Sequence, residues 1–253
     1  MVLSSVYPTH TFSLFHILYI IISIALIVGS MILIKKYVKK EKTLMIIYIM
    51  ASILTLVFVT INRIGETIYD TANDENATWT MILPHSICSF CSLVIPIAFL
   101  INRKDNFVVH SLYACGFLGG LSNIIYPDPL NNGYIYELRI WSSLAHHFCL
   151  LWLLSCLLVT GVIKPAMRKM YYWPLAACVV TTFGVFELDV LKLTKAMNIG
   201  RPLLSDVPVL TDWYMLYIGI FIAEFIFTFL YEKLHDKKSV KEIFTFKKNN
   251  CEQ

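Results

Sequence analysis

The sequence has few charged residues and no long polar stretch of the kind that covers a soluble domain. Only 15% of its 253 residues are charged and 57% are hydrophobic, whereas soluble domains carry about 25% charged residues. The alternating pattern of a membrane β-barrel is also absent. These absences exclude a soluble globular protein and leave helices whose backbone hydrogen bonds are satisfied within each membrane span.

Apolar residues come instead in seven long runs, and each has roughly the 17–25 residues that a helix needs to cross about 30 Å of hydrocarbon. We place these runs near 12–35, 43–62, 80–101, 106–126, 141–163, 170–190 and 213–232. The expected fold class is all-α, a polytopic membrane protein with a bundle of seven transmembrane helices. We expect one transmembrane domain over 1–232 and a basic tail over 233–253.

Lys and Arg are distributed unevenly between the two sides that these spans define. One side holds five Lys after the first span, further basic residues in two later loops, and the Lys-rich tail. The other side holds only Arg63, Arg139, Lys192, Lys195 and Arg201. The positive-inside rule therefore predicts an external N-terminus and a cytoplasmic C-terminus. The net charge of +4 is expected to contact anionic lipid headgroups at the cytoplasmic face, and it does not indicate nucleic-acid binding.

No Lys or Arg precedes the first apolar run, which is also too long for a cleaved signal peptide. We therefore expect this run to be a membrane span. The expected location is the cell membrane, with multiple passes.

Polar residues gather in the outer halves of the predicted spans. At about 1.5 Å per residue, Cys88 and His147 both lie about 12 Å inside the outer surface. Asn123 and Glu187 lie near the outer ends of their spans, whereas Glu224 is near the midplane. Ionisable residues in a bilayer are costly and normally face the bundle interior or a water-filled cavity. This asymmetry predicts an outward-facing polar cavity bounded by the third to sixth spans.

A Cys and two His residues are the candidate chemistry. His85 and Cys88 are three residues apart, a spacing that places them on one face if both are helical. A neighbouring His activates a thiol as a nucleophile, and His147 is the candidate base if its span packs against that of Cys88. Ser86 is an alternative nucleophile. The plain alternative is that these residues only pack, because buried Cys is usually inert and His commonly joins membrane helices.

Two other kinds of site are weaker candidates. Cys88 and Cys91 form a C-x-x-C, which would suit an intramembrane thiol oxidoreductase, but the predicted outer loops have no Cys for a second thiol pair. A metal site built from His16, His146, His147 and Cys88 lacks a ligand spacing such as H-x-x-x-H. We therefore expect no metal and no cofactor.

Four segments resemble, in order, motifs of the YwaF-like bacterial integral membrane protein family. They are Leu83-Pro84-His85-Ser86-Ile87-Cys88-Ser89, Gly116 to Gly120 with Pro127-Asp128, Arg139 to His147, and Arg201-Pro202 to Ser205 with Trp213-Tyr214. Cys88 and His147 occupy matching positions. The family's His before the Cys falls on Ser86, while His85 takes the preceding position, and one residue turns a helical side chain by about 100°.

This family is distantly similar to eukaryotic transmembrane acyltransferases that remodel ether phospholipids, which implies acyl transfer or lipid hydrolysis with a Cys and a His. The partner would then be a membrane phospholipid or lysophospholipid. In that reading Arg139 or Arg201 holds a phosphate, and Asn123 and Asp128, which lie in or near the motifs, contact the substrate.

Two classes of function therefore remain open. The first is a membrane-embedded lipid acyltransferase or hydrolase with Cys88 as nucleophile. The second is a non-enzymatic carrier or membrane-embedded binding subunit, in which Glu224 and His147 contact the substrate or a proton.

Overall fold

The computed structural model describes residues 12–73, 79–103, 106–127, 137–193, 196–199, 213–239 and 242–243. The secondary structure of these residues is all-α, as predicted. The seven α-helices are α1 (Leu14–Tyr37), α2 (Glu41–Asn73), α3 (Ile87–Ile101), α4 (Phe107–Ile125), α5 (Leu138–Val159), α6 (Tyr172–Asp189) and α7 (Trp213–Leu230). Short 3₁₀ segments join some of them, including η1 (Trp79–Ile82) and η4 (Ala196–Asn198).

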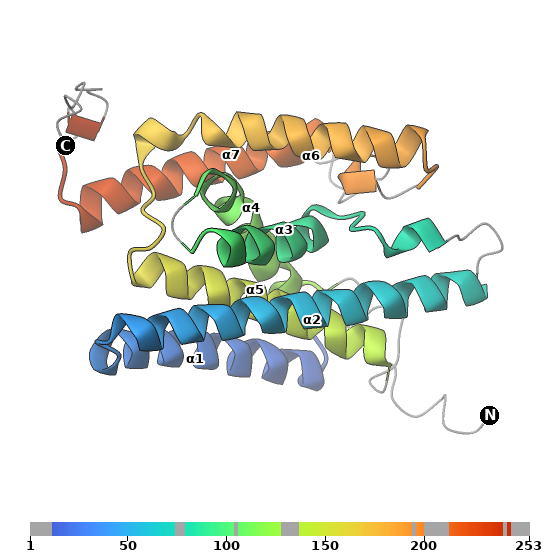
Figure 1. Ribbon diagram of the computed structural model, residues 1–253, viewed down its shortest axis with the longest axis horizontal. Coiled ribbons are helices and arrows are strands. Elements are labelled where there is room, and N and C mark those ends of the chain that lie inside the picture. The colour runs from blue at the N-terminus through green and yellow to red at the C-terminus, as the bar shows by residue number, and fades with distance from the viewer. Residues whose placement is uncertain are drawn as a thin grey trace.

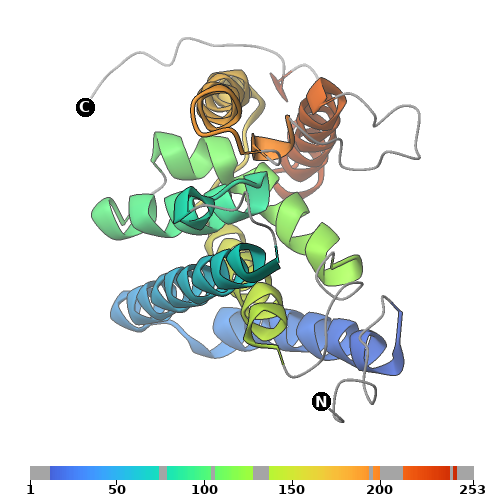
Figure 2. The same cartoon turned by 90° about the vertical axis from the view of Figure 1, so that its right-hand side faces the viewer.

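The helices form three layers (Figure 1). α6 and α7 make one outer layer, α1, α2 and α5 make the other, and α3 and α4 lie between them in both views (Figures 1 and 2). α4 is seen nearly end-on in Figure 1, so it crosses the long helices α2 and α6. It contacts α1, α3, α5, α6 and α7, and this central position lets α4 join the polar residues of several helices.

Five of the seven helices are long and apolar enough to cross a membrane, which makes the chain a multi-pass membrane protein. They are α1, α2, α4, α5 and α7. α3 has only 15 residues, and the 18 residues of α6 include Glu187 and Asp189. The seven predicted spans therefore correspond to seven helices, but the lengths and compositions of α3 and α6 do not identify them as spans.

Buried residues are concentrated in α4 and α5. In the most apolar 18-residue stretch of each helix, 56% of α4 and 67% of α5 are buried, against 22% in α1 and in α7. Apolar surface on the outer helices suits lipid, so specific contacts must hold the helices together. Hydrogen bonds between helices supply some of them. Tyr48 Oη donates to Thr160 Oγ1 at 2.7 Å, and Tyr19 Oη donates to the carbonyl of Leu144 at 2.9 Å.

The third helix begins later than the sequence predicted. The apolar run 80–101 is interrupted by Pro84, and α3 starts only at Ile87. Ser86 is the N-cap, with its hydroxyl oxygen accepting from the backbone N–H of Ser89 at 3.3 Å. Ser and Thr are favoured at this position because they satisfy an N–H that has no partner within the helix. The late start places Cys88 in the first helical turn and leaves His85 outside the helix.

Candidate active site

Cys88 lies at the amino-terminal end of α3 and is only partly buried. The first turn of a helix has N–H groups without intrahelical partners and the positive end of the helix dipole. Both favour negative charge on a nearby atom, whereas partial burial of the thiol opposes it.

α4 packs directly against the Cys88 thiol. A Cβ atom added at Gly119 would lie 2.6 Å from Cys88 Sγ, so only glycine permits this approach. One turn further along, Asn123 Nδ2 donates to Cys88 Sγ at 3.5 Å and to the carbonyl of Gly119 at 3.2 Å. The carbonyl of Gly119 therefore orients the amide that meets the sulfur. We call Cys88, Gly119 and Asn123 the thiol cluster.

The neighbouring Gly120 brings α4 against α5 at His147. A Cβ atom added at Gly120 would lie 3.3 Å from the carbonyl oxygen of His147. The glycine pair therefore places one turn of α4 in contact with both Cys88 and the backbone of His147. No hydrogen bond joins Cys88 to His147 in the described part of the chain. The two residues are linked through α4.

His147 is 6% exposed, and among the described residues none forms a hydrogen bond with its Nδ1 atom. Its ring lies 3.9 Å, centre to centre, from the ring of His146. His146 Nδ1 in turn pairs with the hydroxyl of Ser92 at 3.1 Å. The two adjacent histidines are thus both buried, but one has a partner on α3 and the other keeps a nitrogen that could exchange a proton with a ligand.

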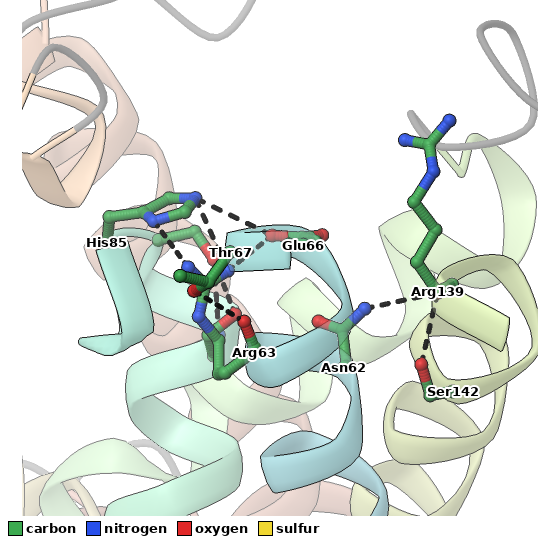
Figure 3. A network of polar contacts seen from close by, with 9 residues as sticks. Asn62, Arg63, Glu66, Thr67, His85, Arg139 and Ser142 are labelled. Atoms are coloured by element: carbon green, nitrogen blue, oxygen red, sulfur yellow. Dashed lines mark hydrogen bonds and ion pairs between the residues drawn. The ribbon is translucent and has the colours of Figure 1, made fainter. Parts of the chain in front are cut away.

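His85 belongs to a separate buried network, shown in Figure 3. Arg63 of α2 donates to His85 Nδ1 at 2.8 Å and is paired with Glu66, whose carboxylate oxygen lies 3.8 Å from His85 Nε2. Arg63 and His85 are 5% and 7% exposed. A guanidinium can only donate, so the nitrogen of His85 nearest to it must accept. We call Arg63, Glu66 and His85 the arginine network.

The predicted shared helical face of His85 and Cys88 is therefore wrong. The expectation needed both residues on one helix, but His85 precedes the N-cap and α3 begins after it. Its ring is directed at Arg63 and Glu66 in Figure 3. Ser86, the alternative nucleophile, caps α3 and contacts the hydroxyl of Ser89 at 3.0 Å, which is a sufficient structural role.

Arg139 lies at the start of α5, where its Nε donates to Glu137 at 2.5 Å and its guanidinium covers the ring of Tyr69 at 3.8 Å. Figure 3 shows its side chain directed away from the arginine network, while its backbone carbonyl accepts from Asn62 at 3.1 Å. Its predicted role in holding a phosphate stays a prediction.

The remaining predicted residues fall in three groups. His16 is fully buried and satisfied, because Nδ1 accepts from the N–H of Phe12 and Nε2 donates to the carbonyl of Ile124, both at 2.9 Å. Glu224 of α7 is 3% exposed, and its Oε2 atom has no hydrogen-bond partner among the described residues. Asp128 and Arg201 lie outside the described residues.

The proposed metal ligands are not assembled in the described part of the chain, where no group of three or more His, Cys, Asp or Glu is placed to hold a metal ion. The ring of His16 instead forms hydrogen bonds at the start of α1, with the N–H of Phe12, and at the end of α4, with the carbonyl of Ile124. The described cysteines are all free thiols, and Cys91 adjoins Cys115 on α4.

Sequence reasoning underestimated the arginine network and gave Glu187 no role of its own. Arg63 and Glu66 lie at the outer end of the second predicted span, where charged residues are also common as ordinary interfacial residues. Their spacing of three residues was the available signal, since it puts them on one face of α2. Glu187 is fully buried, and nothing in its position along the chain distinguishes it from exposed Asp189.

The comparisons with known proteins identify a family. The model of the TMEM164 family matches residues 11–233, which is most of the chain. No curated protein and no solved structure matches the chain.

Proposed function

The chain belongs to the TMEM164 family, and from the geometry of its site we propose that it is a membrane-embedded enzyme that transfers or hydrolyses the acyl chain of a phospholipid. The family relates to ether-lipid acyltransferase-like membrane proteins. The finer resemblance to the YwaF-like group agrees with this proposal but is not needed for it.

One observation carries the proposal: α4 has no side chain where Cys88 Sγ approaches, and it places an amide donor on the sulfur. A cysteine that only fills space needs neither feature, because burial of a thiol is favourable without a donor. The approach of Gly119 and the hydrogen bond from Asn123 instead suit a sulfur that carries charge during a reaction.

The reaction would proceed in two steps. Cys88 Sγ attacks the ester carbonyl of the acyl donor, and the thiol proton passes through His147 to the departing alcohol as the ester bond breaks. The product is an acyl thioester on Cys88. In the second step the hydroxyl of a lysophospholipid or water attacks the thioester, the bond from carbon to sulfur breaks, and the thiol is restored. Asn123 and the N–H groups at the start of α3 would stabilise the developing negative charge.

The substrate class follows from the setting of the site. The thiol cluster lies among helices of a multi-pass protein, where an acyl chain has direct access from the bilayer. A phospholipid or lysophospholipid would place its anionic headgroup towards the end of the bundle that carries Arg63 and Arg139. The two steps as written need no cofactor, because Cys88 supplies the nucleophile and His147 carries the proton.

We further propose that this end of the bundle faces outward in the cell membrane. The opposite end carries the basic residues from the last turn of α1 to the start of α2, between α5 and α6, and after α7: Lys35, Lys36, Lys39, Lys40, Lys42, Lys164, Arg168, Lys169, Lys233, Lys237 and Lys238. The positive-inside rule favours a cytoplasmic location for these residues, where they would contact anionic headgroups.

A second candidate function is a carrier, and Glu224 is the observation that favours it. A carboxyl group that is buried on α7 with an unpartnered oxygen resembles the ionisable groups that bind substrates or protons in transporters. In that case Glu224→Gln would abolish transport, whereas Cys88→Ala would leave it nearly unchanged.

The test is to trap the acyl-enzyme on the full-length protein in detergent. The purified protein is incubated with a phospholipid, quenched in acid and digested, and the Cys88 peptide is examined by mass spectrometry. We expect an acyl adduct on Cys88 that hydroxylamine removes. Adducts confined to other cysteines, or none in the wild-type protein, would overturn the proposal.

A further inference from the structure

Glu187 of α6 is a buried carboxyl group that the two-step reaction above does not use. Its side chain is fully buried, and among the described residues no donor forms a hydrogen bond with either carboxyl oxygen. Burying a carboxylate without a partner is costly. Such groups are concentrated at functional sites, where a ligand or a proton completes them.

Contacts between α6 and α3 place this carboxyl near the start of α3. Phe183, one turn before Glu187, lies 5.8 Å from Phe90 between ring centres. The two helices run in opposite directions here (Figure 1), so one turn forward along α6 and one turn back along α3 reach the same level. Glu187 therefore lies one turn beyond the residue of α6 that packs against α3.

Backbone contacts also join the end of α6 to the segment before α3. A Cβ atom added at Gly184 of α6 would lie 2.9 Å from the Cβ of Met197 in η4. The backbone N–H of Met197 in turn donates to the carbonyl of His85 at 2.8 Å. The end of α6 therefore packs, through η4, beside the segment that leads into α3.

We propose that Glu187 is a second proton-transfer residue of the site, the one that activates the acyl acceptor. This inference rests on the proposed function. In the second step, Glu187 takes the proton from the attacking hydroxyl as the oxygen bonds to the thioester carbon. The bond from carbon to sulfur breaks, and Glu187 returns the proton to the Cys88 thiolate. The acyl chain and the proton are both conserved, and no further reactant is needed.

This role divides the two steps between two residues. The backbone of His147 on α5 contacts Gly120, the neighbour of Gly119 at the thiol, whereas Glu187 belongs to α6 in the opposite layer (Figure 1). An acyl acceptor that enters on the α6 side would meet Glu187 before it meets the thioester. The carboxyl oxygens without donors would then accept the hydroxyl proton of the acceptor.

The test separates the two steps with p-nitrophenyl octanoate as the acyl donor and water as the acceptor. Release of p-nitrophenolate in an initial burst reports acylation of Cys88, and the later steady rate reports hydrolysis of the thioester. We expect Glu187→Gln to keep the burst and to lower the steady rate by about 100-fold, the lower range for loss of a general base. Mass spectrometry should then find the octanoyl group accumulated on Cys88.

Three controls keep the inference falsifiable. Asp189→Asn removes an exposed carboxylate from the same helix and should change neither rate. Hydroxylamine, a strong nucleophile that needs no base, should release the octanoyl group as octanohydroxamic acid from Glu187→Gln as fast as from the wild type. If Glu187→Gln does not fold, Glu187→Asp carries the test, since a shorter carboxylate should slow hydrolysis more than acylation.

The outcomes distinguish the inference from the proposed function. A steady rate in Glu187→Gln equal to that of the wild type, or equal losses in both phases, overturns the role of Glu187 alone. An absence of burst and of thioester in the wild type overturns the proposed function and this inference with it.

Discussion

The first and second turns of α3 each carry a thiol, and the two thiols have opposite surroundings. Cys88 is partly exposed and accepts a hydrogen bond from Asn123, whereas Cys91 is fully buried in the apolar core beside Cys115. A Cβ atom added at Gly119 would lie 2.6 Å from Cys88 Sγ, whereas one added at Gly116 would lie 3.4 Å from the Cβ of Cys91 and would be crowded instead by Ile95 at 2.9 Å.

The difference teaches which cysteine the fold treats as a reactive group. Three residues along one helix are enough to move a thiol from the polar first turn, where N–H groups are unpaired, into the apolar core. Cysteine is thus a candidate nucleophile at position 88, whereas at position 91 it only fills space in the core. Each prediction below changes one side of this comparison.

The largest effect is expected from the thiols themselves. Cys88→Ala should remove the acyl adduct and reduce acyl transfer by roughly 1,000-fold or more, since the covalent route is lost. Cys91→Ala should retain most of the activity and lower the free energy of unfolding by about 1 kcal/mol through the small cavity it leaves. Comparable losses of turnover in the two variants, measured with a phospholipid donor, would remove the distinction between the two turns.

The next effect concerns the close approach of α4. Gly119→Ala should displace Cys88 and reduce activity by about 100-fold, as expected for a shift of about 1 Å in a reacting group. Gly29→Ala is the matched control, because a Cβ atom there meets nothing within 4 Å. Steady-state rates and unfolding curves of both variants measure the effect. Full activity in Gly119→Ala would show that the thiol does not need its observed position.

A smaller effect is expected from the amide donor. Asn123→Ala should slow alkylation of Cys88 by iodoacetamide about 10-fold, which corresponds to about 1.4 kcal/mol, because a hydrogen bond to a charged sulfur is lost. Ser122→Ala removes the neighbouring hydroxyl, which bonds only within α4, and should leave the rate unchanged. The rate is read by mass spectrometry of the Cys88 peptide, with Cys91 as the internal reference that stays unmodified.

The smallest effect is expected at the N-cap. Ser86→Ala should lower the free energy of unfolding by about 1 kcal/mol, the usual cost of removing a serine cap, and should retain the acyl adduct on Cys88. Thermal unfolding and the trapping experiment measure the two quantities. Loss of the adduct with unchanged stability would instead favour Ser86 as the nucleophile.

Much of the fold was predictable because the bilayer imposes simple rules on sequence. Long apolar runs predicted all seven helices, and their order and approximate bounds agree with the structure. Two helices depart from the predicted bounds. The sequence ended the second span at 62 but α2 continues to Asn73, and it placed the third span over 80–101 but α3 begins only at Ile87. Hydropathy does not distinguish residues in a helix from apolar residues just before it, and the local signals of Pro84 and Ser86 decide the boundary.

The candidate site was only partly predictable. The residue types and the end of the bundle where they gather followed from counting along each span. Whether His85 faces Cys88 did not, because that depends on one helix boundary and on Arg63, which is 22 residues away. The burial of Glu187 was likewise invisible, since it depends on how α6 packs against the middle layer.

The sequence by itself therefore determined that this protein is a helical, multi-pass membrane protein with several thiols and histidines in its apolar segments. Each of those properties is local, because the length and polarity of a segment decide whether it crosses the membrane as a helix. Only the tertiary structure decided which groups meet: Gly119 and Asn123 with Cys88, Arg63 with His85, and Glu187 with no donor among the described residues. These pairings depend on how helices cross, and side chains that are far apart in the chain meet only where the packing of several helices brings them together.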